Sequence, residues 1–203
     1  MRKPANPVQR YVAFLRAINV GGHTVKMDVL RKLFERLGFR NVETFIASGN
    51  VIFETPAGNL QQLEEQIARH LQNALGYEVT TFIRTPIELA EIAAFQPFSV
   101  AETEAPGTSL FIVFLPAPLS DRVQRQLRSF RTEADDFRVR GREIFWLSRA
   151  STAESPFARP LLGKTLGAPA TVRNVKTVRK LAAKYPAPPG EGSGPRNAGP
   201  RAQ

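Results

Sequence analysis

Cysteine is absent from this chain of 203 residues, and histidine occurs only twice. Without cysteine the chain has no disulfide bonds, no thiol nucleophile and no cysteine-ligated metal, and it suits a reducing cytoplasm. His23 and His70 have no partners at the spacing that metal ligands need. We therefore expect no metal and no cofactor.

Long apolar runs are also missing. No stretch approaches the roughly 18 consecutive apolar residues that a membrane-spanning helix requires. Residues 1–9 contain charged residues and prolines but lack the apolar core of a secretory signal. These two absences predict a cytoplasmic protein with no membrane partner.

Basic residues outnumber acidic ones, with 28 Lys and Arg against 18 Asp and Glu, so the net charge is +10. Such an excess raises the affinity for nucleic acid and for other anionic ligands. The charge is spread along the chain rather than concentrated in one segment. It is therefore equally consistent with a solvated basic surface that has no dedicated partner.

The first half of the chain alternates between strand-like and helix-like patterns. Apolar runs and one-sided apolar periodicity predict strands over 10–16, 42–47, 51–54 and 78–84, and helices over 27–37 and 59–75. Gly38 and Gly76 are suitable helix ends, and Asn59 is a suitable N-cap. The resulting order, β-α-β-β-α-β, is the ferredoxin-like pattern.

The second half resembles a looser version of the same order, although it shows no obvious sequence identity with the first. We expect helices over 86–95, 119–130, 156–162 and 174–185, a polar loop over 96–108, and strands over 110–115, 137–139, 143–147 and 170–172.

The predicted fold class is therefore α+β, with two tandem ferredoxin-like units over residues 10–85 and 86–185. We expect mixed or antiparallel sheets with helices packed on one face. Residues 1–9 form a flexible N-terminus. Residues 186–203 are rich in proline and glycine and form a disordered tail.

The most informative segment follows the first strand and reads LRAINVGG over residues 15–22. It places a cation, an amide and two adjacent glycines at the end of a strand, where backbone N–H groups can approach an anion closely. The segment matches neither the P-loop nor the dinucleotide-binding fingerprint. It indicates where a site would lie but does not indicate which ligand or reaction the site would serve.

Candidate ligand-binding residues are polar residues and glycines near the ends of the expected strands: Arg16, Asn19, Gly21, Gly22, Lys26, Ser48, Asn50, Arg173 and Asn174. Each has a structural alternative. Arg16 could form an ion pair, residues 48–50 could form a hairpin turn, and Asn174 could cap a helix. The loop after the first strand and this hairpin turn need not share one end of the sheet. No nucleophile–base pair emerges, so the catalytic residues, and whether the chain is an enzyme, stay open.

Three segments together resemble a known family: LRAINVGG over 15–22, FIASGNVIF over 45–53 and TVRNVKTV over 171–178. The chain is similar to the bacterial proteins grouped as domain of unknown function 1697 (DUF1697), over nearly all of residues 10–185. This resemblance implies an α+β fold of two ferredoxin-like halves and no established activity. The chain departs from the family pattern in two places. Val175 stands where a tryptophan is expected, and the segment 23–26 lacks the expected additional lysine or asparagine.

Three functions fit these observations. The first is binding of a small anionic or nucleotide-like ligand near the loop after the first strand. The second is binding of RNA or single-stranded nucleic acid, with Tyr11, Phe45 and Phe53 as stacking aromatics, but the chain lacks the RNP1 pattern and this function is not favoured. The third is a homo-oligomeric assembly protein without catalysis. The sequence does not determine the oligomeric state.

Overall fold

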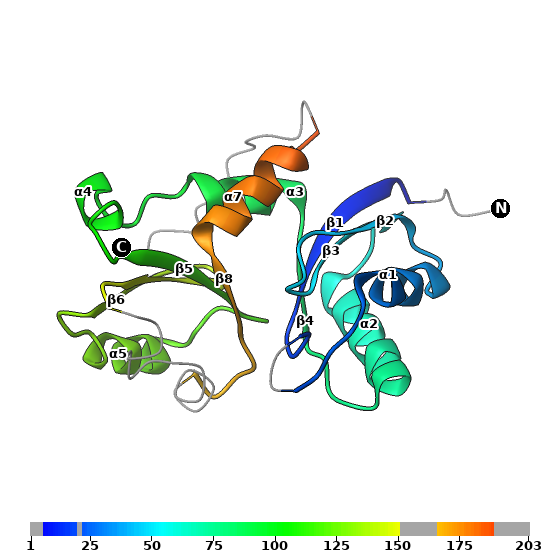
Figure 1. Ribbon diagram of the computed structural model, residues 1–203, viewed down its shortest axis with the longest axis horizontal. Helices are drawn as coiled ribbons and strands as arrows, with labels where there is room; N and C mark the ends of the chain where they lie inside the picture. The colour runs from blue at the N-terminus through cyan, green and yellow to red at the C-terminus, as the bar shows by residue number, and fades with distance from the viewer. Residues whose placement is uncertain (1–5, 20–21, 151–165, 189–203) are drawn as a thin grey trace, which may run out of the picture.

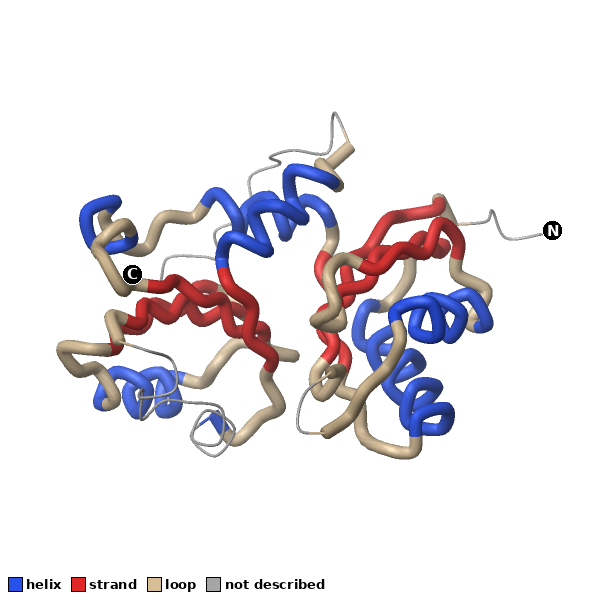
Figure 2. Tube along the Cα trace, viewed as in Figure 1, coloured by secondary structure: helices blue, strands red, loops and turns tan. Residues whose placement is uncertain are grey.

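The computed structural model describes residues 6–19, 22–150 and 166–188, which form two four-stranded antiparallel sheets flanked by helices (Figures 1 and 2). The first sheet has the strand order β2-β3-β1-β4 and contains β1 (Val8–Leu15), β2 (Arg40–Thr44), β3 (Asn50–Pro56) and β4 (Thr81–Arg84). The second has the order β6-β7-β5-β8 and contains β5 (Ser109–Phe114), β6 (Asp135–Arg140), β7 (Glu143–Ser148) and β8 (Thr171–Asn174). The predicted α+β class with two units is confirmed.

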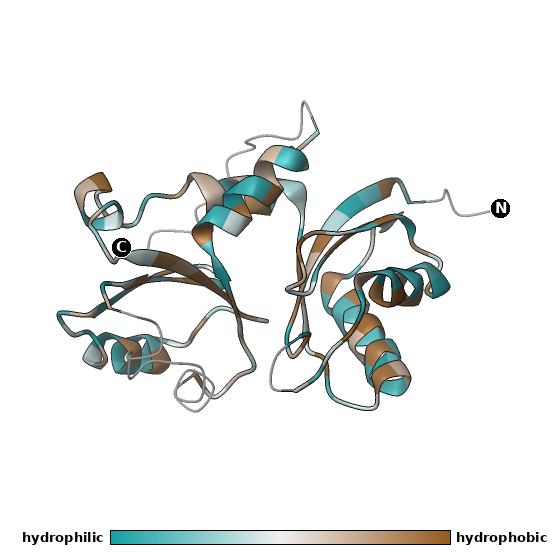
Figure 3. Ribbon diagram, in the orientation of Figure 1, coloured by the Kyte–Doolittle hydropathy of each residue, from teal (hydrophilic) through white to brown (hydrophobic). Residues whose placement is uncertain are grey.

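The helices of the first half begin and end close to the predicted residues. α1 spans Met27–Arg36 and α2 spans Leu60–Leu75. The side chain of Asn59 accepts the N–H of Gln62 at 3.0 Å and so caps the start of α2. Figure 3 shows hydrophilic and hydrophobic residues on both helices, as expected for helices with one face on a sheet.

The second half contains α3 (Pro86–Ala94), α4 (Val100–Thr103), α5 (Asp121–Ser129) and α7 (Val175–Lys184). The expectation of a loop without helix over residues 96–108 is wrong, because α4 lies there. Ser99 and Glu102 each bond the backbone N–H of the other, and this capping box stabilises a single helical turn. The expected helix over 156–162 and the tail from residue 189 onward lie outside the described residues.

Both faces of the first sheet are covered, which corrects the expectation of helices on one face only. α1 and α2 cover one face and bury Tyr11 and Phe53 (Figure 1). The other face contributes Phe14 to a core that also contains residues of α3, α7 and the second sheet. α5 packs on the far face of the second sheet. The two halves therefore share one apolar core.

The two halves also place matching residues at matching positions. Arg84 on β4 lies opposite Val12 on β1, and Arg173 on β8 lies opposite Ile112 on β5. Each arginine directly precedes the N-cap residue of a helix, α3 or α7, and these two helices contact each other. The strand register thus indicates an internal repeat that runs from β1 to α3 and again from β5 to α7.

Phe14 and Phe114 meet between the two sheets. Their rings stack with centroids 4.0 Å apart and an interplanar angle of 14°. Phe14 lies opposite Asn50 in the first sheet, and Phe114 lies opposite Glu143 in the second. Each ring also faces the guanidinium of one of the two buried arginines, at 5.7 and 5.4 Å. The centre of the molecule is therefore an aromatic stack between two cations.

Glu64 on α2 gives the first sheet a pH-dependent contribution to stability. Its carboxylate accepts the backbone N–H of Ile83 on β4 at 2.6 Å. Burial raises the pKa of Glu64, although this hydrogen bond opposes the shift. A raised pKa in the folded state means that the stabilising contribution is complete at low pH and is lost as pH rises through that pKa.

We expect Glu64→Gln to be more stable relative to the wild type at about pH 7 than at about pH 4, because glutamine keeps the acceptor and carries no charge. Urea unfolding of both proteins at the two pH values measures the difference. Glu65→Gln, at an exposed position on the same helix, is the control. An equal difference at both pH values would show that the charge of Glu64 does not matter.

Candidate functional site

The loop after β1 and the β2–β3 turn lie at the same end of the first sheet. The N–H of Leu15 donates to the carbonyl of Gly49 at 2.8 Å. Asn19 Nδ2 donates to the carbonyl of Ala47 at 3.0 Å, and Asn19 Oδ1 accepts the N–H of Val25 at 2.7 Å. Asn19 thus connects the segment after β1 to the β2–β3 turn, and the predicted site residues of these two segments lie close together.

These two segments have an unusual backbone. Ala17, Asn19 and Ile46 have positive φ angles of 67°, 54° and 51°, a conformation that costs energy for residues other than glycine. Gly49 has φ 70°, and a Cβ there would lie 3.0 Å from Cβ of Ile18. Glycine is favoured at this position, because both the left-handed φ angle and the close approach to Ile18 would strain a side chain.

Arg173 brings the third motif to the same end of the sheet, but its guanidinium is buried and fully used. A guanidinium carries five N–H donors. Their acceptors are Asn50 Oδ1 at 2.6 Å, Thr171 Oγ1 and the Val172 carbonyl both at 2.8 Å, the Leu15 carbonyl at 2.9 Å and the Gly49 carbonyl at 3.4 Å. Arg173 therefore joins β8 to the first sheet and has a structural role.

Two other predicted residues have similar structural roles. Asn50 Nδ2 donates to the carbonyl of Phe45 at 3.0 Å and to Ser48 Oγ at 2.8 Å, so both predicted polar residues of this turn bond within it. Asn174 Oδ1 accepts the N–H of Lys176 at 2.9 Å and caps α7. Their hydrogen bonds support the structural alternatives for these positions.

Arg16, Gly22 and Lys26 are the described candidates that stay exposed, and Gly21 lies outside the described residues. Sequence alternation predicts Arg16 on the face of Val12 and Phe14. The strand ends at Leu15, however, and the left-handed Ala17 follows, so alternation no longer applies to Arg16.

The aromatic residues proposed for nucleic-acid stacking do not form an open platform. Tyr11 and Phe53 are buried under α1 and α2, with 1% and 0% of their surface exposed. Phe45 is partly buried against the shared core. Base stacking on an open sheet face, as in RNA-recognition domains, needs exposed rings, and these three residues do not supply them.

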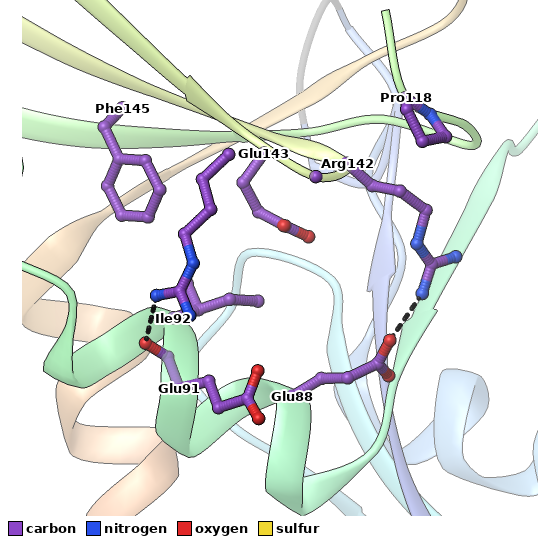
Figure 4. Close-up of a pocket in the computed structure, with 9 residues that line it drawn as sticks. Glu88, Glu91, Ile92, Pro118, Arg142, Glu143 and Phe145 are labelled. Atoms are coloured by element: carbon purple, nitrogen blue, oxygen red, sulfur yellow. Dashed lines mark hydrogen bonds and ion pairs between the residues drawn. The ribbon is translucent and has the colours of Figure 1, made fainter. Parts of the chain in front are cut away.

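A cavity of about 570 Å³ lies elsewhere, between α3 and the β6–β7 hairpin (Figure 4). Its lining residues are Glu88, Glu91 and Ile92 of α3, Pro118 after β5, Arg140, Gly141, Arg142 and Glu143 of the hairpin, and Phe145 of β7. Glu143, Phe145 and Ile92 are buried, whereas Glu91, Pro118 and Arg140 are exposed. The cavity therefore has a buried floor and an accessible, charged rim.

Ion pairs and hydrogen bonds hold the rim. Arg142 Nη2 lies 2.9 Å from Glu88 Oε1, and the other oxygen of Glu88 accepts the N–H of Thr85 at 2.9 Å. Burial disfavours ionisation of Glu88, but the Thr85 hydrogen bond and the charge of Arg142 outweigh it and lower its pKa. Arg140 donates to the Glu91 carbonyl at 3.4 Å. Glu88 is therefore ionised at neutral pH.

Glu143 forms the charged part of the floor. Its side chain is 10% exposed, and Oε1 accepts from Arg84 Nε at 2.6 Å. Arg84 also donates to the carbonyls of Ile83 at 2.7 Å and Leu115 at 3.0 Å. Glu143 Oε2 has no hydrogen-bond donor among the residues that the structure describes, and the carboxylate points into the space between the hairpin and α3 (Figure 4).

Sequence reasoning missed this cavity. It placed residues 140–142 only between the expected strands 137–139 and 143–147, and it gave Arg84 and Glu143 no role. A usable signal was the arginine that directly precedes the N-cap of a helix, Arg173 before the predicted cap Asn174 and Arg84 before Thr85, whose capping role was not predicted. Arg84 and Glu143 are 59 positions apart in the sequence, and no pattern in the sequence pairs them.

Comparisons with known proteins concern the family and the fold. A family model described as "Protein of unknown function (DUF1697)" matches residues 8–145. The chain is similar to the structure of the conserved bacterial protein SP0830 from Streptococcus pneumoniae, with 22% identity and a TM-score of 0.71 over 88% of this chain and 99% of that chain. No curated protein matches. At this identity the likeness shows the fold alone.

The helices in the described part of the chain include none with the length and apolar character of a membrane span. No group of three or more His, Cys, Asp or Glu side chains in the same residues is arranged to hold a metal ion.

Proposed function

Because the chain belongs to the DUF1697 family, whose description assigns no activity, we propose from its geometry that it binds a small polar ligand in the cavity between α3 and the β6–β7 hairpin. The volume of about 570 Å³ lies within the range of small-molecule sites, roughly 300–1,000 Å³. Such sites combine an apolar floor with a few polar groups that fix the ligand. Here Phe145 and Ile92 form the apolar floor. The polar groups are Glu143, Arg140 and Arg142.

Glu143 Oε2 is the observation that carries this proposal. Arg84 donates to one oxygen of Glu143 and fixes the carboxylate in place. The second oxygen is not enclosed by protein and opens to the cavity, where a ligand can reach it. A ligand that donates to Oε2 completes this arrangement.

We expect a thermal-shift screen of nucleotides, amino acids and small acids and amines to give compounds that raise Tm. A ligand at about 100 times its Kd stabilises the folded state by about 2.7 kcal/mol. Glu143→Gln should reduce the shift, and Glu104→Gln, at an exposed position outside the cavity, should keep it. An absence of compounds that shift the wild type, or full shifts in Glu143→Gln, would contradict the proposal.

The exposed cations beside the loop after β1 support a second candidate, an anionic or nucleotide-like ligand there. Arg16 and Lys26 are exposed at the two ends of a loop that Asn19 braces. A phosphate group would find two cations and the backbone N–H of Gly22. If compounds from the screen lose their effect in Arg16→Ala but keep it in Arg36→Ala, at an exposed position of α1, this site is the correct one.

We also infer that both units are ferredoxin-like. The strand order β2-β3-β1-β4 with all neighbours antiparallel supports this for the first unit, and the order β6-β7-β5-β8 supports it for the second. The register of Arg84 and Arg173 favours a boundary after α3 instead of the predicted boundary after residue 85.

A further inference from the structure

We infer that the ligand of this cavity is a small zwitterion of the amino-acid type, with its ammonium group on Glu143 and its carboxylate on Arg140. The inference rests on the proposed function and adds the chemical class of the ligand. It follows from the unused hydrogen-bonding groups of the cavity wall and from where the hairpin places them.

The unused groups are of both signs. Glu143 Oε2 is an acceptor without a donor among the described residues. Arg142 uses Nη2 on Glu88, and Arg140 donates to the Glu91 carbonyl at 3.4 Å; the structure as described gives their remaining side-chain N–H groups no acceptor. The wall therefore offers one negatively charged acceptor and several positively charged donors, which a ligand with both an ammonium and a carboxylate can satisfy.

Strand register places these opposite charges next to each other. Arg140 and Glu143 are directly opposed across the β6–β7 hairpin, and side chains of opposed residues start roughly 5 Å apart. They do not bond each other. Glu143 accepts a hydrogen bond from the buried Arg84. The guanidinium carbon of Arg140 lies 4.7 Å from the ring centroid of Phe95, at the end of α3. An α-amino acid carries its ammonium and its carboxylate on one carbon atom, so it can face both of these neighbouring side chains.

Charge balance excludes ligands of one sign. A purely anionic ligand would meet the carboxylates of Glu88, Glu91 and Glu143. A purely cationic ligand would meet Arg140 and Arg142 on a protein of net charge +10. Like charges brought close together are unfavourable in a partly desolvated site. A zwitterion meets an opposite charge at each end, and an apolar side chain on it can pack on Phe145 and Ile92.

Isothermal titration of the full chain with three probes of one carbon skeleton tests the class: L-leucine, 2-hydroxy-4-methylpentanoate and 3-methylbutylamine. The hydroxy acid lacks the ammonium, and the amine lacks the carboxylate. We expect leucine to bind at least ten-fold more tightly than either. In Glu143→Gln, leucine should no longer bind more tightly than the hydroxy acid. In Arg140→Gln, the ratio of the leucine affinity to the amine affinity should fall.

Arg140 is exposed, so Arg140→Gln keeps the test usable if Glu143→Gln folds poorly. If the hydroxy acid or the amine binds as tightly as leucine, the zwitterion class is overturned. If none of the twenty L-amino acids shifts Tm, while other compounds do so through Glu143, the zwitterion class also fails and the proposed function survives. If no compound acts through Glu143, the proposed function itself fails.

Discussion

Replacing Arg84 by methionine is expected to lower the free energy of unfolding by about 3–5 kcal/mol. Arg84 is fully buried, and its loss leaves the carboxylate of Glu143 without a counterion. The carbonyls of Ile83 and Leu115 lose a donor at the same time. Folded proteins are stable by only roughly 5–15 kcal/mol, so this single change removes a large part of the total. Urea unfolding at neutral pH measures it.

A second substitution separates the charge from the packing. In Arg84→Met/Glu143→Leu both charges of this pair are removed, so we expect at least half of the lost stability to return. Arg142→Met is the matched control, because Arg142 lies beside Glu143 on the hairpin, is half-buried and pairs with Glu88 of α3. It should cost about 1 kcal/mol or less. A double variant as unstable as Arg84→Met would show that the Glu143 charge is not the cause.

Replacing Arg173 by methionine is expected to cost about 3 kcal/mol, because several buried acceptors lose a charged donor. Asn50 Oδ1 and the Leu15 carbonyl are the closest of those outside β8, at 2.6 and 2.9 Å. Lysine should not rescue the variant, because a single ammonium cannot reach acceptors that surround a planar guanidinium. Arg179→Met, at an exposed position on α7, should have little effect.

Hydrogen exchange gives a second measure of the same substitution. Loss of Arg173 should speed exchange of the Leu15 amide, which bonds the Gly49 carbonyl, while amides of the β6–β7 hairpin keep their protection. Unchanged exchange at Leu15 would contradict the role assigned to Arg173. The internal repeat adds a comparison: Arg84→Met should cost more than Arg173→Met, because Glu143 is left as an unpaired charge whereas Asn50 is neutral.

The first half of the fold could be predicted because its signals are local. Asn59 caps α2 and Gly76 ends it, and each acts within a few residues of its position. α4 was missed because its only signal is the pair Ser99 and Glu102, which is easily overlooked in a proline-containing segment. The shared core was not predicted, because alternation along β1 does not say what covers the face of Phe14.

The candidate site was harder to predict than the fold. Sequence analysis identified the segments around Arg16 and Arg173, and the structure brings them together. It could not tell that Arg173 is buried, since this depends on contacts with residues more than 120 positions away. Glu143 was missed for the same reason, because its partner and its cavity exist only after the two halves have packed together.

A crystal structure of the full chain with a saturating concentration of the tightest-binding amino acid tests the central claim most directly. We predict that the amino acid lies between α3 and the β6–β7 hairpin, with its ammonium group within hydrogen-bonding distance of Glu143 Oε2 and its carboxylate on Arg140. An empty cavity, with the ligand bound beside Arg16 and Lys26 instead, would contradict it.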